Sequence, residues 1–173
     1  MSSHKPQPIS GVSADSENLV MSVWPSISAT GLGRGLGVLN DSIPIEINGI
    51  KLSHLLFPLP LSPFALFEYA RLKFVGDRYV LTNQSVQIWK SLGSRLVSQV
   101  SLSDIDQIDV EELPGQAFYR AADLVLLDAA GKLLMRLQAV PCAEVFRQTI
   151  IKARDAHLQV GASLAVIQAR QSA

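Results

Sequence analysis

Five acidic side chains cluster between residues 104 and 112, and neighbouring carboxylates can transfer protons or bind Ca²⁺. The alternation of apolar and polar residues from position 107 onward puts Asp109 and Glu111 on the outer face of a strand. The spacing of a calcium loop, with its central glycine, is missing. We therefore interpret the cluster as a solvated face, made of Asp104, Asp106, Asp109, Glu111 and Glu112.

Four alternating glycines at positions 31, 33, 35 and 37 invite comparison with loops that bind phosphate. A dinucleotide fingerprint needs glycine where Leu36 stands, and the Gly-Lys-Ser/Thr of a Walker loop is absent. The same residues form two GxxxG pairs, Gly31 with Gly35 and Gly33 with Gly37, which would let a helix approach a partner closely in a membrane. Because four glycines disfavour a helix, the sequence predicts a flexible connector, with close packing as the alternative.

Nucleophilic catalysis has little support. A single cysteine, Cys142, excludes a disulfide or a zinc cluster built within one chain. The three histidines, at positions 4, 54 and 157, are far apart in sequence, and there is no Gly-x-Ser-x-Gly elbow. We expect a protein that is not an enzyme and that carries neither a cofactor nor a metal.

The charge balance limits the possible partners. The 173 residues include 15 basic and 15 acidic side chains, which give a formal net charge of 0. Without a basic stripe we expect no nucleic-acid partner. At 48% hydrophobic and 17% charged residues, the chain is somewhat apolar for a soluble protein. Residues 1–17 are rich in Ser and Pro and lack the core of a secretory signal, so we expect a flexible cytoplasmic tail.

The stretch from residue 52 to residue 67 contains no Asp, Glu, Lys or Arg. As one helix it would cover about 24 Å, which is less than the roughly 30 Å of a bilayer core. Pro58, Pro60 and Pro63 would also break a continuous helix. A short hairpin that enters the membrane and returns fits both facts, and a Pro-rich loop packed on protein is the alternative. The side chains expected in the membrane are Leu55, Leu56, Phe57, Leu59, Leu61, Phe64, Leu66 and Phe67.

Basic residues stand on both sides of this apolar stretch. Lys51 precedes it, and Arg71, Lys73 and Arg78 follow it. Positive charge on both flanks indicates that both ends lie on the cytoplasmic face. We expect these four side chains to contact lipid headgroups, at about 1 kcal/mol for each cation near an anionic surface.

Beyond Phe74 the apolar residues alternate with polar ones, as in half-buried strands. The pattern predicts strands at 78–82, 85–90, 95–102, 107–113, 118–128 and 133–139, and a shorter one at 18–24. A helix is predicted to begin at Pro141. Beyond residue 157 it either continues or frays at Gly161. Its predicted apolar face is Val145, Phe146, Thr149, Ile150 and Ala153.

Several stretches resemble a known family. Residues 78–86, Arg-Tyr-Val-Leu-Thr-Asn-Gln-Ser-Val, are similar to the Tyr-x-Leu-Thr-Asn-Arg-Arg-Val of bacterial pleckstrin-homology (PH) proteins. Gln84 and Ser85 stand where that family often has two arginines. Further resemblance to a membrane-associated branch lies at 24–26, 33–34, 114–119, 122–125, 146–149 and in the apolar stretch.

The resemblance implies an α+β, mainly antiparallel fold. This would be a PH-like split barrel of about seven strands, capped by a C-terminal helix, with an apolar Pro-rich insert. The domain would span residues 18–156, between tails at 1–17 and 157–173. Its first strand would lie at 18–25, a Gly-rich and apolar membrane hairpin at 28–72, and the remaining strands and the helix at 73–156.

The implied function is a non-catalytic docking or scaffold module on the cytoplasmic face of a bacterial inner membrane. Its expected partners are a membrane surface, a membrane protein complex or other copies of itself. The alternative is a structural or assembly subunit of a larger bacterial membrane complex.

Overall fold

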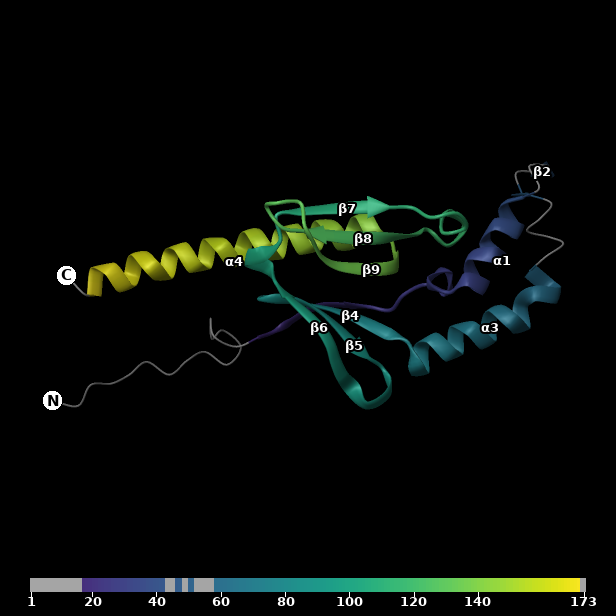
Figure 1. The fold of residues 1–173 in the computed structure, drawn as a ribbon, viewed down its shortest axis with the longest axis horizontal. Helices are drawn as coiled ribbons and strands as arrows, with labels where there is room; N and C mark the ends of the chain where they lie inside the picture. The colour runs from purple at the N-terminus through teal and green to yellow at the C-terminus, as the bar shows by residue number, and fades with distance from the viewer. Residues whose placement is uncertain (1–16, 43–45, 48–49, 52–57, 172–173) are drawn as a thin grey trace.

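Two antiparallel sheets with seven strands in total and a long C-terminal helix form most of the described chain (Figure 1). The structure is a computed structural model, and it describes residues 17–42, 46–47, 50–51 and 58–171. The α+β class, the seven antiparallel strands and the C-terminal helix agree with the prediction. Closure of the strands into a split barrel stays a prediction.

The first sheet has the strand order β1-β4-β5-β6. Its strands are β1 (Leu19–Val23), β4 (Asp77–Thr82), β5 (Ser85–Lys90) and β6 (Arg95–Ser101). Strand β1 pairs antiparallel with β4, so that Val23 lies opposite Tyr79. The chain before and after residues 24–76 therefore belongs to one sheet.

The second sheet has the order β7-β8-β9, again antiparallel. Its strands are β7 (Gln107–Glu111), β8 (Ala121–Leu127) and β9 (Leu133–Pro141). Short 3₁₀ turns connect several strands: η2 (Leu92–Ser94) lies between β5 and β6, η3 (Leu102–Asp104) between β6 and β7, and η4 (Ala117–Tyr119) between β7 and β8.

One apolar core joins both sheets to helix α4 (Ala143–Gln171). Leu81 and Val86 come from the first sheet, Leu124 and Leu137 from the second, and all four are fully buried. Burial of such a side chain contributes about 1.5–3 kcal/mol. The Tyr79 hydroxyl also connects the sheets, because it donates to the Gln138 carbonyl and accepts from the Gln138 N–H, both at 3.0 Å.

Helix α4 differs from the prediction at its start and along its buried face. Pro141 ends β9, and Cys142 follows with a positive φ of 49° before the helix begins. The buried residues Ala143, Phe146 and Ile150 recur at helical spacing, whereas Val145 is 60% exposed. The predicted face therefore included one side chain that points away from the sheets.

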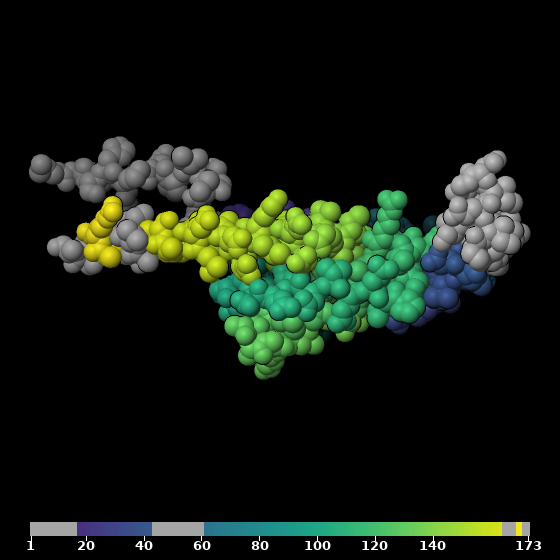
Figure 2. Space-filling view, turned by 90° about the horizontal axis from the view of Figure 1, so that it is seen from above, coloured from purple at the N-terminus to yellow at the C-terminus, as the bar shows by residue number. Residues whose placement is uncertain are grey.

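Beyond its packed half, α4 continues through residue 161 to Gln171. A single glycine costs a helix only about 1 kcal/mol relative to alanine. Figure 2 shows this part extending past the sheets.

Two helices replace the predicted connector and the Pro-rich insert. Helix α1 (Gly31–Asp41) follows the short turn η1 (Ile27–Ala29), and α3 (Pro58–Val75) leads into β4. They lie side by side at the end of the molecule away from the C-terminus (Figure 1). Strands β2 (Glu46–Ile47) and β3 (Ile50–Lys51) pair between them in sequence.

Candidate functional site

Helix α1 forms despite its four glycines because tertiary contacts require small residues there. A Cβ on Gly33 would lie 1.9 Å from the Ile27 carbonyl oxygen, and one on Gly37 would lie 2.1 Å from the Gly115 oxygen. The Thr30 side chain caps the helix by accepting from the Gly33 N–H at 3.0 Å. The prediction of a flexible connector is therefore wrong. Close packing is observed at Gly33 and Gly37 against turns of this same chain, whereas nothing lies within 4 Å of a Cβ placed on Gly31 or Gly35.

Helix α3 contains the prolines that were expected to break it. Pro58 and Pro60 lie in its first turn, where backbone N–H groups have no partner within the helix. Only Pro63 lies deeper and removes a backbone hydrogen bond. A continuous helix of 18 residues results, so the expectation of a break in this stretch is wrong for its described part.

The inner face of α3 packs on the molecule through Leu61, Ala65, Glu68 and Leu72, which recur every three or four residues. Glu68 is only 7% exposed. Its two carboxylate oxygens accept from Nη1 of Arg71, each at 3.2 Å. A buried carboxylate needs such a partner, so Arg71 neutralises Glu68 within the helix.

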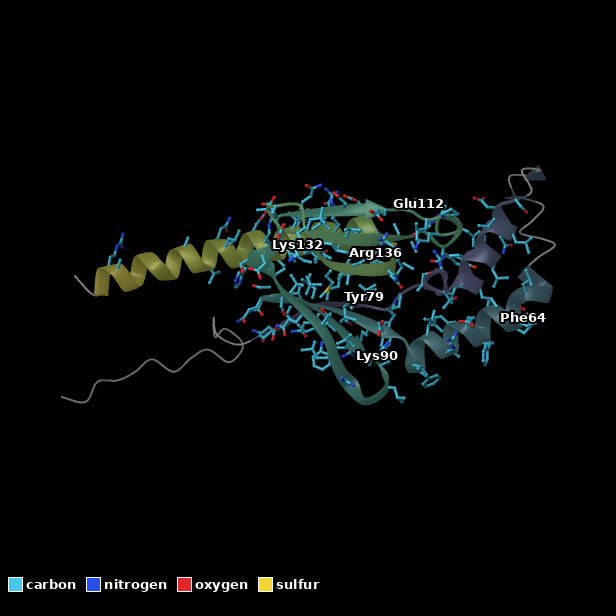
Figure 3. All side chains as sticks on the ribbon, viewed as in Figure 1. Phe64, Tyr79, Lys90, Glu112, Lys132 and Arg136 are labelled. Atoms are coloured by element: carbon cyan, nitrogen blue, oxygen red, sulfur yellow. The ribbon has the colours of Figure 1, made fainter. Side chains whose placement is uncertain are left out.

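The rest of α3 exposes a broad apolar surface, which we call the α3 outer face. Phe64 lies on the side of α3 turned away from α1 (Figure 3). A helix that is apolar around most of its circumference usually contacts other protein or lipid, and a large exposed apolar patch marks an interaction site. The α3 outer face comprises Phe64 (58% exposed), Leu66 (68%), Phe67 (68%), Tyr69 (53%), Phe74 (72%) and Val75 (54%).

Cationic groups gather where α3 meets the first sheet. The Lys73 ammonium lies 5.5 Å from the centre of the Tyr69 ring, and the Arg78 guanidinium lies 5.8 Å from that of Trp24. Lys90 lies on the neighbouring strand β5 and pairs with Asp77 at 2.6 Å. The side chains are thus held near the α3 base by aromatic rings and one carboxylate.

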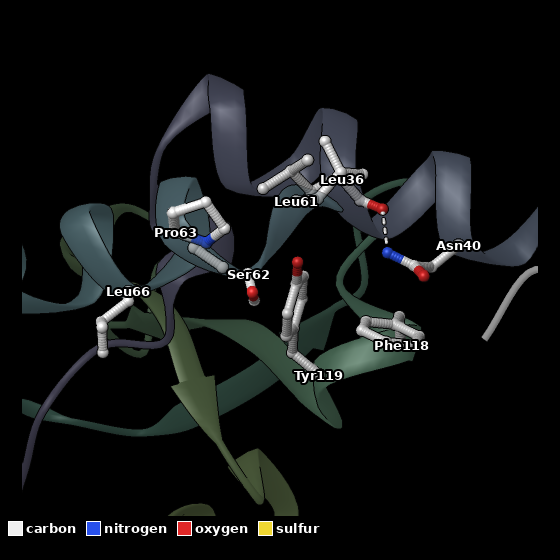
Figure 4. Close-up of a pocket in the computed structure, with 9 residues that line it drawn as sticks. Leu36, Asn40, Leu61, Ser62, Pro63, Leu66, Phe118 and Tyr119 are labelled. Atoms are coloured by element: carbon white, nitrogen blue, oxygen red, sulfur yellow. Dashed lines mark hydrogen bonds between the residues drawn. The ribbon is translucent and has the colours of Figure 1, made fainter. Parts of the chain in front are cut away.

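A cavity of about 590 Å³ separates α1, α3 and η4 (Figure 4). The Tyr119 ring reaches into it from η4. Burial raises the pKa of the Tyr119 hydroxyl. A tyrosine hydroxyl is protonated at neutral pH even at its ordinary pKa of about 10. The apolar lining comes from all three elements and includes Leu36, Leu61, Pro63, Leu66, Phe118 and Tyr119.

Asp123 fixes the loop that carries Tyr119. Its carboxylate is 2% exposed and accepts from the Gln116 side chain at 2.7 Å and from the Ala139 N–H at 2.9 Å. Arg136 donates to the same carboxylate at 3.0 Å and also pairs with Glu111. These bonds hold η4 against β8, which places its aromatic pair beside α1.

The predicted site residues fall into three groups. Phe64, Leu66 and Phe67 are exposed on α3, whereas Leu61 lines the cavity and packs inward. Lys73 and Arg78 both lie beside Trp24 at the α3 base, whereas Arg71 pairs with Glu68 and lines a separate small cavity. Leu55, Leu56 and Phe57 lie outside the described residues, as do the side chains of Lys51 and Leu59.

Sequence reasoning missed Glu68, Tyr69 and the cavity lined by Phe118 and Tyr119. Glu68 is the first acidic residue after an apolar run, which is a usable signal. The sequence carried no comparable signal for the cavity, because the walls of the cavity come from segments that are far apart in sequence.

Among the described residues, no group of three or more His, Cys, Asp or Glu side chains gathers as metal ligands would. No protein-family model matches the chain, and no curated protein or solved structure resembles it significantly. The resemblance to bacterial PH proteins therefore stays a prediction.

Proposed function

We propose that this chain is a non-catalytic docking module, a PH-like domain held on the cytoplasmic face of a bacterial inner membrane by helices α1 and α3. The observation that carries the proposal is the α3 outer face, whose apolar side chains are 53–72% exposed. Exposure of three phenylalanines to water is unfavourable, and covering each of them with an apolar phase lowers the free energy by about 1.5–3 kcal/mol.

The lengths of the helices support entry into the membrane from one side. Helix α3 has 18 residues and is about 27 Å long, and α1 has 11 residues and is about 17 Å long. A bilayer core of about 30 Å exceeds both. No helix among the described residues is long and apolar enough to cross a membrane. Both helices lead back to strands of the same sheet, which suits a hairpin that enters and returns.

The charge distribution fits the same orientation. Lys73 and Arg78 lie at the base of α3, between the apolar helix and the first sheet. When the helix enters the hydrocarbon region, these cations reach the depth of the lipid phosphates. Anionic lipid would then strengthen binding by about 1 kcal/mol for each cation near the surface.

Flotation with lipid vesicles tests the proposal. The full chain should float with vesicles of phosphatidylcholine and phosphatidylglycerol, and more weakly without the anionic lipid. The variant Phe64→Ser/Phe67→Ser/Phe74→Ser should stay with the protein fraction, because the α3 outer face has lost its aromatic side chains.

The matched control is Val110→Ser/Leu133→Ser/Val145→Ser, which removes three exposed apolar side chains of the β7–β9 sheet and α4. It should float like the parent chain. Equal flotation of both triple variants would show that α3 does not dock.

The alternative function, a structural or assembly subunit of a membrane complex, draws on the same surface, because a helix that is apolar all round is also typical of the inside of a larger assembly. Purification in mild detergent separates the two. A partner retained in fixed stoichiometry by the parent chain and lost by the phenylalanine variant, together with no flotation on pure lipid, would favour the subunit.

A further inference from the structure

The cavity between α1, α3 and η4 has the size and chemistry of a ligand site. Its volume of about 590 Å³ lies within the range of about 300–1,000 Å³ that is typical of small-molecule pockets. None of its lining residues is charged. The polar side chains among them are Asn40, Ser62 and Tyr119, and the Asn40 amide already donates to the Leu36 carbonyl at 2.9 Å.

The cavity adjoins the α3 outer face. Leu66 lines the cavity and is also 68% exposed, whereas its neighbour Phe67 belongs only to the outer face. An apolar surface therefore runs from the outside of α3 over Leu66 into the space beneath it. A ligand that enters along this route meets hydrocarbon throughout.

We propose that this cavity holds one acyl chain of a membrane phospholipid when the α1–α3 pair is in the bilayer. The inference rests on the proposed membrane docking and adds to it a specific lipid site. The cavity lining disfavours a charged ligand, because no charged side chain lines it to offset the water that such a group loses.

The position of Arg71 agrees with a lipid in this orientation. It follows Leu66 by five residues, which corresponds to about 7.5 Å along the helix axis. The headgroup of a lipid whose chain occupies the cavity would thus lie toward Arg71 and Lys73 at the α3 base. The protonated Tyr119 hydroxyl inside the cavity can donate to an ester carbonyl of the same lipid.

Quenching of tryptophan fluorescence by lipids with brominated acyl chains tests the assignment, since bromine quenches only at short range. The full chain would carry a reporter in the cavity, Tyr119→Trp, or on the outer face, Phe67→Trp. Trp24 and Trp89 stay in place, and their quenching in the parent chain is subtracted. The probe is vesicles of brominated phosphatidylcholine with phosphatidylglycerol.

We expect both reporters to be quenched. Filling the cavity with Ala65→Phe should lower the quenching of Tyr119→Trp severalfold and leave that of Phe67→Trp unchanged. Leu36→Phe, from the opposite wall, is a second filling variant in case the first unfolds. Ala130→Phe, in the exposed turn between β8 and β9, is the matched control and should change neither signal.

The outcomes distinguish the two proposals. Quenching of Phe67→Trp without quenching of Tyr119→Trp would overturn the acyl-chain site and leave membrane docking intact. Quenching of Tyr119→Trp that persists in both filling variants would also overturn it, because the surrounding bilayer would then be the quencher. Quenching of neither reporter, together with absent flotation, would overturn docking itself.

Discussion

At the scale of single residues, buried polar groups hold the sheets and loops in register. Asp123 is the clearest case, since its carboxylate accepts from a side-chain amide, a backbone N–H and Arg136 in a nearly dry position. Asp123 also affects the surroundings of α1 and α3, because it fixes the loop that carries Tyr119.

Replacement of Asp123 by alanine should therefore lower the free energy of unfolding by about 2–5 kcal/mol, because the buried Gln116 amide and Ala139 N–H lose their acceptor. Glu111→Ala removes the half-exposed partner of the same arginine and should cost less than about 1 kcal/mol. Urea unfolding of both variants measures the difference. Equal losses would mean that the Asp123 network does not stabilise the fold.

Glu17 makes the stability of the fold depend on pH in the acidic range. Hydrogen bonds from the Ser85 hydroxyl at 2.5 Å and the Thr82 hydroxyl at 2.8 Å favour its charged form and lower its pKa below the ordinary value. A lowered folded-state pKa contributes stability that is complete above the unfolded-state pKa and is lost as the pH falls through the folded-state value.

The acid-induced loss of stability should therefore be smaller in Glu17→Gln than in the parent chain. Urea midpoints of both chains at pH 7 and at pH 3 give the two losses. Parallel losses would show that Glu17 is not held in its charged form by the fold.

At the scale of elements, α1 and α3 are helices whose sequences argue against a helix. In α1 the glycines differ in their surroundings: Gly37 touches Gly115, whereas nothing lies within 4 Å of a Cβ placed on Gly35. Four glycines among its eleven residues make the isolated helix less stable, and the close tertiary contacts at two of them offset this loss.

The two glycines give opposite predictions for the same substitution. Gly35→Ala should raise the free energy of unfolding by up to about 1 kcal/mol, because alanine favours the helix. Gly37→Ala should lower it by about 1–3 kcal/mol, because the new methyl group forces α1 away from Gly115. Thermal unfolding in the same buffer compares them, and a stabilising Gly37→Ala would contradict the packing of α1 on that turn.

At the scale of the whole molecule, the helix pair is an insertion between two strands of one sheet. Strands β1 and β4 pair directly, and Thr30 and Gly76 line the same small cavity beside Tyr79. The chain thus leaves and re-enters the sheets at neighbouring points, while the apolar core lies elsewhere, between the sheets and α4.

Replacing residues 31–75 with a short Gly/Ser linker should therefore leave the sheets and α4 folded. Vesicle flotation should be lost, because the α3 outer face is gone. Near-ultraviolet circular dichroism with a cooperative thermal transition checks the fold, with the parent chain as reference. A shortened chain that still floated would place the docking surface outside the helix pair.

The sequence alone determined the parts whose signal is local. Alternating apolar residues located the strands of both sheets to within a few residues, and a helical repeat located α4, because a surface half in water and half in the core imposes that periodicity. Strand β4 ends at Thr82 and β5 begins at Ser85, which are the positions that the alternation predicted.

Tertiary structure decided the rest. Helix α1 packs on Gly115, about 80 residues further along the chain. The two backbones lie so close together there that no side chain would fit between them, and this contact favours glycine in the helix. The cavity exists only because the Asp123 network holds Tyr119 opposite α1 and α3. Local sequence preferences predict neither feature, because both depend on contacts between segments that are far apart in the sequence.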